Sequence, residues 1–555
     1  MSDPSQLPQP AAGCLPTGVT NQHATDAFKL RFGTATRQAM NFGIVTHPTN
    51  TDLTNFPDGL GTYSKALTQT SPGIAEATSF QAFLQACGLK PGGTVGDFDN
   101  PNIVLGGTAK MNGPRGALSW QQVGEDSQGY GDPIVPAPPA LDSIEYAIEL
   151  VELYWASLLR DVPFEDYPTN ATAKAAAHEL STLAAAYPAR YAGPLDSASK
   201  VTLHLLFRGG LNAHPTWFSG EDVGPYLSQF CIIPTSLGRL PVDQKIVTYK
   251  PAQDFMITLC EWFRIQNGKP QTSAAALDDA RRYMHCGRDT AAYTQVDELY
   301  QAYLIAYLVA NSVGLPSNPG SPYAQCSTAM KPYLNDKPFS TFGGPDIAAT
   351  LAAVARAAIN AVWYQKWLVH LRHRPESGGG IVHLLKTGAL NPTDAAKLSS
   401  LDIVLNSEAL KNSHKRNGSY LLSQAFPEGS PTHPAYPTGH GTVAGACITV
   451  LKFFLDGDAS FTYRVAPSSD GLSLDPYNGP GPLTVNGELH KLAHNISFGH
   501  GIHAGIHWRS DTDYSILLGE AVAIDYMLDQ MWTYQEDFDI KITKIDGTKQ
   551  HFKNY

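Results

Sequence analysis

Charged residues are scarce in this chain and do not gather anywhere along it. Only 16% of the 555 residues are Asp, Glu, Lys or Arg, against roughly 25% in an average globular protein. The net charge of -11 comes without a basic tail or stripe. This argues against nucleic acid as a partner, because neutralising phosphates takes clustered cations. So little charge predicts that much surface is buried, in a large core or between subunits.

Long apolar runs and targeting patterns are also missing. No stretch approaches the roughly 18 consecutive apolar residues of a membrane-spanning helix, and the N-terminus shows no signal pattern of basic and then apolar residues. We therefore expect no membrane partner and, by default, a cytoplasmic location. Cysteines are few, widely spaced and free of any Cys-x-x-Cys pair, so we expect mostly buried, reduced thiols. They are Cys14, Cys87, Cys231, Cys260, Cys286, Cys326 and Cys447.

The composition divides the chain into four regions. Residues 1–138 are rich in Gly, Pro, Thr and Asn, which predicts an irregular N-terminal arm that wraps the body or a neighbouring subunit. Apolar residues at helical spacing predict a first helical region over 139–340 and a second over 341–538. An alternating stretch around an Asp-Gly turn predicts a small C-terminal β-hairpin within 539–555.

Helices are expected over most of the body, and strands over almost none of it. The expected helices cover residues 79–87, 141–161, 171–187, 274–283, 293–311, 347–371, 440–455 and 515–532. No series of alternating strands lies between them, so the predicted fold class is all-α, built from helical bundles.

Three separated polar clusters contain the residues that could bind a ligand or take part in a reaction. The first places Lys366 in the last turns of a predicted helix and Arg374 just beyond its end, before Pro375. Fixed cations of this kind could bind an oxyanion. They could also merely offset the negative end of the helix dipole, and the cluster taken alone favours that interpretation.

The second cluster immediately precedes an apolar helix. The Thr438 hydroxyl and the Gly439 amide at a helix N-terminus would form a ready anion site, although Thr438 could equally be a simple helix cap. His440 favours the anion site, because it could accept or donate a proton beside such an anion. His433 lies in a proline-rich turn, and taken alone it is more typical of a solvated loop.

The third cluster spaces His500, His503 and His507 by three and four residues, so on a helix they would share one face. They could bind a metal, serve as polar core groups, or supply one ligand to the central atom of an anion. The spacing does not choose among these, since the zinc-protease pattern is missing and nearby glycines weaken the helix. Together the three clusters predict a pocket for one tetrahedral oxyanion, phosphate or its analogue vanadate.

In chain order, Lys-x7-Arg-Pro, Pro-Thr-Gly-His and Gly-x-His-Trp resemble the three-part signature of the vanadium-dependent haloperoxidase and type 2 acid phosphatase superfamily. Segments 150–155, 159–164, 287–291 and 365–370 further resemble its algal and cyanobacterial bromoperoxidase branch. The resemblance covers nearly all of the chain from about residue 50 onward. It implies the helical-bundle fold of these enzymes, a vanadate cofactor, and a homo-oligomer that is a dimer or larger.

The resemblance also implies how the pocket holds vanadate. His507 corresponds to the axial ligand, whose imidazole nitrogen binds vanadium. Lys366, Arg374, the Thr438 hydroxyl and the Gly439 amide correspond to the groups that bind the equatorial oxygens. Phosphate is expected to fit the same site.

The implied reaction uses hydrogen peroxide to oxidise bromide, and also iodide, to a hypohalous acid equivalent that could halogenate a small organic acceptor. His440 corresponds to the acid/base residue, and Lys366 to the cation that polarises the oxygen attacked by halide. His433 falls where bromoperoxidases carry histidine, and Trp363 matches a halide-side tryptophan of part of the family.

Two positions depart from the family pattern. Thr438 replaces the usual serine and keeps the hydroxyl. Gly501 stands six residues before the axial histidine, where a second arginine normally lies, so one charge-assisted bond of roughly 1.5–3 kcal/mol is missing. His500 or His503 could compensate only if protonated, whereas Arg509 is not expected to turn back.

Two other functions would use the same pocket. In a phosphomonoesterase, His507 would become the nucleophile and His440 the leaving-group acid. A non-catalytic helical protein that stores an oxyanion, or that is purely structural, is the third interpretation, and Gly501 gives it some weight.

Overall fold

The computed structural model describes residues 7–11, 21–41, 45–324, 333 and 335–555. Helices dominate this part of the chain, and its strands form only two-stranded antiparallel hairpins. The predicted all-α fold class is therefore confirmed. Of the cysteines, Cys14 and Cys326 lie outside the described residues; the rest are free thiols, and all of these except Cys260 are buried.

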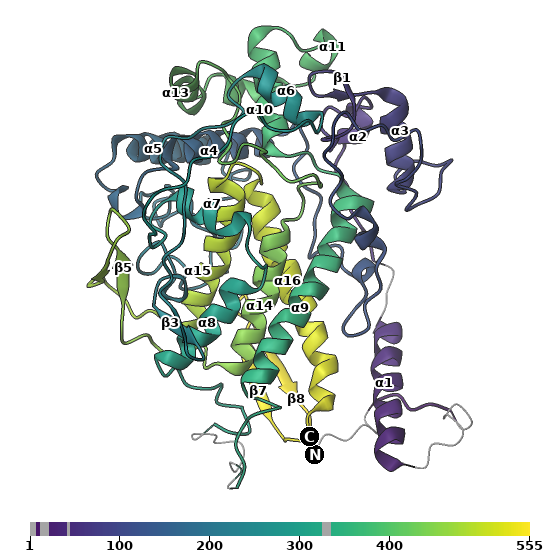
Figure 1. Cartoon of the computed structure of the whole chain (residues 1–555), viewed down its shortest axis with the longest axis vertical. Coiled ribbons are helices and arrows are strands. Elements are labelled where there is room, and N and C mark those ends of the chain that lie inside the picture. Colours follow the sequence, from purple (N-terminus) through teal and green to yellow (C-terminus); the bar gives the residue numbers. More distant parts are fainter. Residues whose placement is uncertain (1–6, 12–20, 42–44, 325–332, 334) are drawn as a thin grey trace.

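Long helices packed side by side form the centre of the molecule (Figure 1). They are α9 (Gly344–Tyr364), α14 (Gly439–Phe454), α15 (Val485–Phe498) and α16 (Arg509–Gln530). Every residue of α14 is buried, because its neighbours α9, α15 and α16 enclose it. An apolar helix without a polar face is what such a position requires.

Two glycines let α14 and α16 approach closely. A Cβ atom on Gly445 would lie 1.9 Å from the carbonyl oxygen of Ile516, and one on Gly519 would lie 2.0 Å from that of Thr442. Any side chain at either position would push the helices apart. This contact fixes the start of α14 against the start of α16, where two of the polar clusters lie.

Further helices cover the upper end of the central bundle (Figure 1). The most extended are α4 (Ile144–Leu159), α5 (Ala171–Ala186), α10 (Pro375–Thr387) and α13 (Glu408–Asn417). The N-cap predicted for α4 is present, since the Ser143 hydroxyl accepts a hydrogen bond of 3.2 Å from the Tyr146 amide. The side chain of Asn170 caps α5 in the same way.

The remaining α-helices are α1 (Gln22–Asn41), α2 (Asp52–Asn55), α3 (Ala77–Ala86), α6 (Leu259–Gln266), α7 (Gly287–Gln295), α8 (Gln301–Ser312), α11 (Pro392–Ala395) and α12 (Asp402–Leu405). The hairpins pair β1 (Gln69–Ser71) with β2 (Ile74–Ala75), β3 (Thr235–Leu237) with β4 (Leu240–Val242), and β5 (Val465–Pro467) with β6 (Leu474–Pro476). The predicted C-terminal hairpin is present as β7 (Asp539–Thr543) and β8 (Lys549–Lys553), with Asp539 opposite Lys553.

Three predicted helices differ in the structure, and one of them, predicted over 515–532, begins earlier as α16 at Arg509. Residues 274–283 are not helical, because the segment bridges an extended stretch through the pairs Tyr249–Leu277 and Ile246–Arg282. Tertiary pairing here overrides an alanine-rich local preference for helix. The helix predicted over 293–311 is broken, since α7 ends at Gln295 and α8 begins at Gln301.

The N-terminal region is less irregular than its composition predicts. It contains the long helix α1, which stands apart from the body at the lower right of Figure 1. Asp529 near the end of α16 holds this helix by accepting hydrogen bonds from Arg37 and, at 2.8 Å, from Gln38. Its contact with a neighbouring subunit and the region boundaries at 138, 340 and 538 stay predictions.

One helical run, Gly344–His370, is long and apolar enough to span a membrane by length and composition. It comprises α9 and the turn after it, and 56% of its most apolar window is buried inside the fold. Its neighbours α14 and α16 pack against it, which is the environment of a core helix.

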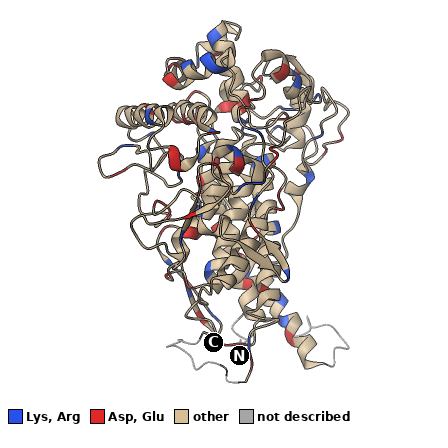
Figure 2. Cartoon of the chain, turned by 60° about the vertical axis from the view of Figure 1, so that its left-hand side comes forward, with Lys and Arg blue, Asp and Glu red and all other residues tan. Residues whose placement is uncertain are grey.

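The few charged residues of both signs are interspersed in Figure 2, which shows no extended patch of one sign on that view. Several charges are instead buried in pairs. His494 on α15 is one of them, with Nδ1 2.5 Å from the Glu221 carboxylate and Nε2 3.2 Å from Asp513. Although burial opposes it, these two carboxylates raise the pKa of His494 from 6.5 to about 9.

We expect the stability of the fold to fall as the pH rises from 6.5 to 9. A folded-state pKa above the unfolded one stabilises the protein fully below pH 6.5, and this contribution is lost as pH passes about 9. The difference corresponds to roughly 3 kcal/mol. Urea unfolding of the wild type and of His494→Gln across this range measures it. Equal pH slopes in the two proteins would contradict the assignment.

Candidate functional site

The structure brings the three polar clusters together at the upper ends of α14 and α16. Arg374 joins two of them, since its Nη1 donates to His507 Nε2 at 2.7 Å and its Nη2 lies 3.0 Å from His433 Nδ1. Lys366 and His440 lie close enough to His507 to influence its charge. All five side chains are buried, with exposed fractions of 8% or less.

Lys366 lies on a π-helical turn, Gln365–His370, that continues α9. π-helical turns are rare and often found at functional sites. The turn ends at Leu371 in the left-handed region, with φ 44°, where a residue other than glycine is strained. The Lys366 ammonium donates to the carbonyl oxygens of Pro434 at 2.8 Å and Ala435 at 2.6 Å. These two hydrogen bonds connect the first cluster to the second.

Arg374 is the N-cap residue of α10 and is fixed by backbone carbonyls. Its Nε donates to His433 O and its Nη1 to Ile506 O, each at 2.9 Å. Gly378 allows α10 to lie this close, because a Cβ atom there would be 2.8 Å from the Trp508 ring. The guanidinium therefore bridges the second and third clusters.

Lys366 and Arg374 have no carboxylate ion-pair partner among the described residues, although both are fully enclosed. Other buried cations here do have one: Arg372 binds Asp511 at 2.6 Å and Glu149 at 3.1 Å, and Arg509 binds Glu152 at 2.6 Å. Buried unpaired charge is costly. The sequence interpretation as cations that only offset a helix dipole does not fit this burial.

The pKa values of these two cations reflect the missing countercharge. Burial, and next the charge of Arg374, hold the pKa of Lys366 well below its usual value. Burial lowers the pKa of Arg374 to about 10. A bound anion would raise both values again, because an opposite charge nearby favours the protonated forms.

Thr438 is the N-cap residue of α14, yet its side chain forms no capping hydrogen bond. The hydroxyl is buried and has no hydrogen-bond partner. The backbone fixes its place, since the Thr438 amide donates to Asp511 O at 3.0 Å. Beside it, the Gly439 amide lies in the first turn of α14, where helix N–H groups lack partners. The simple-cap interpretation of Thr438 is therefore wrong, and its hydroxyl is free for a ligand.

Asp511 orients His507, and the sequence analysis did not single it out. His507 Nδ1 donates to Asp511 Oδ2 at 2.9 Å, which leaves the lone pair on Nε2 to face Arg374. Asp511 in turn accepts from Arg372, which also binds Glu149. The four-residue spacing of the two residues was the available signal, but the helix was predicted to begin only at residue 515, beyond Asp511.

Asp297 is a second functional residue that the sequence did not indicate. His440 Nε2 donates to Asp297 Oδ1 at 2.9 Å, so Nδ1 of His440 is the nitrogen able to accept a proton. Asp297 lies in the break between α7 and α8. The sequence predicted a continuous helix over 293–311, which gave no reason to assign a role to Asp297. Its contact with His440 spans 143 residues, so no local pattern indicates it.

His433 is buried rather than solvated, contrary to the interpretation of its turn taken alone. Its ring lies 4.8 Å from that of Trp363, and the Lys366 ammonium lies 6.0 Å from the same indole. The two aromatic side chains thus form one wall beside the cations.

The histidines of the third cluster do not share one face, because Gly499–His503 is also a π-helical turn. His503 points away from the pocket and binds the Tyr226 hydroxyl at 2.9 Å. Gly501 faces the back of His507, where an added Cβ atom would lie 3.0 Å from His507 Cβ. As expected, Arg509 does not turn back, since Glu152 holds it.

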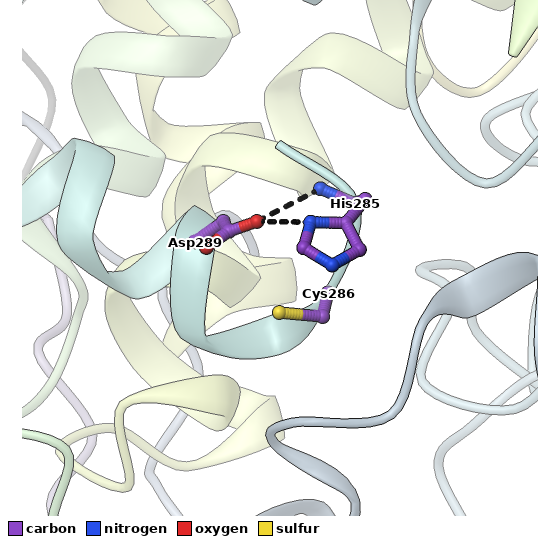
Figure 3. A group of neighbouring side chains, drawn as sticks. All are labelled: His285, Cys286 and Asp289. Carbon is purple, nitrogen blue, oxygen red and sulfur yellow. Dashed lines mark hydrogen bonds and ion pairs between the residues drawn. The ribbon is translucent and has the colours of Figure 1, made fainter. Parts of the chain in front are cut away.

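A second group of potential ligands, His285, Cys286 and Asp289, lies at the start of α7 (Figure 3). Asp289 accepts hydrogen bonds from the His285 amide at 3.2 Å and the Thr248 hydroxyl at 2.6 Å, besides its ion pair with the His285 ring. Burial raises the pKa of the Cys286 thiol well above its usual value. The bond from the His285 amide ties Asp289, in the first turn of α7, to the segment before the helix.

The residues around His507 Nε2 fit a tetrahedral oxyanion. The pocket offers two cations without carboxylate partners, a free hydroxyl and the first amides of a helix, and all of these donate hydrogen bonds to oxygen. The imidazole nitrogen of His507 adds a ligand for a central atom. Phosphate and vanadate meet this description equally.

Comparisons with known proteins agree along nearly the whole chain. The family described as "VCPO second helical-bundle domain" matches residues 346–534. The vanadium-dependent bromoperoxidase of Ascophyllum nodosum is 31% identical over 95% of this chain and 92% of its own length. That of Corallina officinalis is 32% identical over 78% and 77%, respectively.

A solved structure extends this agreement to three dimensions. The homohexameric second vanadate-dependent bromoperoxidase of Ascophyllum nodosum superposes with a TM-score of 0.81 at 26% identity, covering 98% of this chain and 93% of its own. The chain belongs to the vanadium-dependent haloperoxidase family, in its bromoperoxidase branch.

Proposed function

We propose that this protein is a vanadate-dependent bromoperoxidase that oxidises bromide, and also iodide, with hydrogen peroxide. The observation that carries this proposal is the gathering of Lys366 and Arg374, buried and without carboxylates, around His507, whose Nε2 accepts a hydrogen bond from Arg374. The overall reaction consumes hydrogen peroxide, halide and one proton, and releases hypohalous acid and water. A small organic acceptor would then be halogenated by that product.

The oxyanion-binding residues would be Lys366, Arg374, the Thr438 hydroxyl and the Gly439 amide, with His507 Nε2 as the ligand to vanadium. Bound vanadate supplies a Lewis acid that activates peroxide towards halide. The two cations balance the charge of the anion, and the hydroxyl and amide orient it. Asp511 keeps the proton of His507 on Nδ1, so Nε2 stays a ligand.

His440 would handle the proton of the incoming peroxide. Its Nδ1 accepts that proton, and Asp297 stabilises the resulting imidazolium through Nε2. Lys366 would also polarise the oxygen that the halide attacks. His433 and Trp363, in contact with one another beside Lys366, form the wall where we place the halide.

The comparison with the Ascophyllum structure also bears on the oligomeric state. The matching Ascophyllum structure is homohexameric, and the low charge content agrees with extensive burial between subunits. We propose a homo-oligomer, with α1 and the rest of the N-terminal arm contributing to subunit contacts.

The proposed activity is tested by comparing two reactions in one preparation. Protein stripped of bound anions is incubated with orthovanadate, and bromination of a phenol indicator is followed after hydrogen peroxide and bromide are added. We expect bromination that requires vanadate and is suppressed by excess phosphate, because both anions occupy one pocket. Phosphate-ester hydrolysis without vanadate-dependent bromination would favour the phosphomonoesterase. Vanadate binding without either reaction would favour the non-catalytic alternative.

A further inference from the structure

We propose that His500 is an additional oxyanion-binding residue, which donates a hydrogen bond to bound vanadate from the side of the pocket that faces His440. The inference rests on the proposed function, because it assumes that vanadate occupies the pocket around His507. It assigns a role to a residue outside the set built from the motifs.

The ring of His500 lies between the two histidines of the site. It stacks on His440 with ring centroids 3.7 Å apart and an angle of 26° between the planes. Its centroid is 5.6 Å from that of His507. His500 also lies close enough to Arg374 and Lys366 to be influenced by their charge. It therefore lies near His507 and both buried cations.

No described residue satisfies the hydrogen-bonding nitrogens of His500. Nδ1 is fully enclosed and without a partner, and the side chain is only 8% exposed. By contrast, buried His490 bonds through Nε2 to Lys452 at 2.8 Å and through Nδ1 to Ser219 O at 3.1 Å. Since a buried polar atom without a partner is costly, the orphaned nitrogen of His500 points to a ligand.

The π-helical turn explains why His500 rather than Gly501 faces the pocket. Such a turn contains one more residue than an α-helical turn, so the residue presented to the pocket lies seven positions before His507 instead of six. An added Cβ atom on Gly501 would lie 3.0 Å from His507 Cβ, which is a tight approach. The neighbouring imidazole of His500 would therefore occupy the side of the pocket that the missing arginine leaves open.

A neutral imidazole is sufficient for the proposed hydrogen bond. Burial, and next the neighbouring His440, lower the pKa of His500 well below its usual value. A neutral imidazole still has one N–H donor, so the condition that compensation needs a protonated ring does not hold. The bond is weaker than a guanidinium contact, which makes the expected effect of its loss moderate.

Binding of orthovanadate, measured by equilibrium dialysis without peroxide or halide, tests the inference. His500→Phe keeps an aromatic ring to stack on His440 but removes the N–H donor. We expect it to bind vanadate roughly 3- to 10-fold more weakly than the wild type, as the loss of a neutral hydrogen bond predicts. His500→Gln, which restores a donor, should recover part of this loss. His503→Gln, on the same turn but outside the pocket, should bind like the wild type.

Thermal unfolding of each variant identifies any that fails to fold, and the affinities of the folded ones decide. Wild-type affinity in both His500 variants, or equal weakening in His503→Gln, would overturn the role of His500 while leaving the proposed function intact. A wild-type protein that binds no vanadate would overturn both. Phosphate binding by the same variants should follow the same order, because the donor acts on oxygen rather than on vanadium.

Discussion

Replacing His507 with glutamine abolishes vanadate-dependent bromide oxidation and leaves the protein folded. His507 is the imidazole whose Nε2 accepts a hydrogen bond from Arg374, and it is completely buried. Its loss removes the bond to the central atom, whereas loss of a single oxyanion donor costs roughly 10²–10³-fold in rate. We therefore expect a decrease beyond that range, measured as initial bromination rates at saturating vanadate.

The fold should tolerate this change, because Asp511 keeps its bonds to Arg372 and to the Trp508 amide. His551→Gln is the matched control, since His551 is a partly exposed histidine on the C-terminal hairpin. It should brominate at the wild-type rate. Bromination by folded His507→Gln within tenfold of the wild type would contradict the assignment of His507 as the ligand.

Replacing Asp511 with asparagine should damage both stability and vanadate binding. Its carboxylate is fully enclosed and accepts bonds from Arg372 at 2.6 Å, His507 at 2.9 Å and the Trp508 amide at 3.1 Å. Breaking a buried ion pair by changing one partner costs roughly 3–5 kcal/mol. Loss of a group that orients a metal-binding histidine costs about 10–100-fold in affinity. Urea unfolding and equilibrium dialysis of vanadate measure the two effects.

Asp279→Asn provides the control for this prediction. Asp279 forms an exposed ion pair with Lys250 at 3.4 Å, with a carboxylate that is 93% exposed, and exposed pairs contribute about 0–1 kcal/mol. Its stability and vanadate affinity should match the wild type. An Asp511→Asn protein that retained both properties would show that this carboxylate neither anchors the start of α16 nor orients His507.

Local sequence signals were sufficient for the long helices. The α4, α9, α14 and α16 helices were predicted because apolar residues at helical spacing and capping residues such as Ser143 act within a few positions. The segment 274–283 was mispredicted because its conformation depends on pairing with a distant stretch. Intrinsic preference is weak when tertiary bridges compete with it.

The candidate site, too, could be predicted from local sequence only in part. The motif residues could be found because each motif is short, and their burial together could not, since it depends on the packing of α14 against α16. Asp297, which orients His440 from 143 residues away, was missed for this reason, whereas Asp511, which orients His507, lies only four residues from it. Gly501 was singled out by its place in the family pattern, and that pattern did not reveal that the neighbouring His500 stacks on His440.

A crystal structure of the protein soaked with orthovanadate tests the central claim most directly. We predict vanadium within bonding distance of His507 Nε2, with its oxygens contacted by Lys366, Arg374, the Thr438 hydroxyl and the Gly439 amide. Vanadium bound elsewhere, or a His507 Nε2 that remained bonded only to Arg374 in crystals saturated with vanadate, would contradict the account.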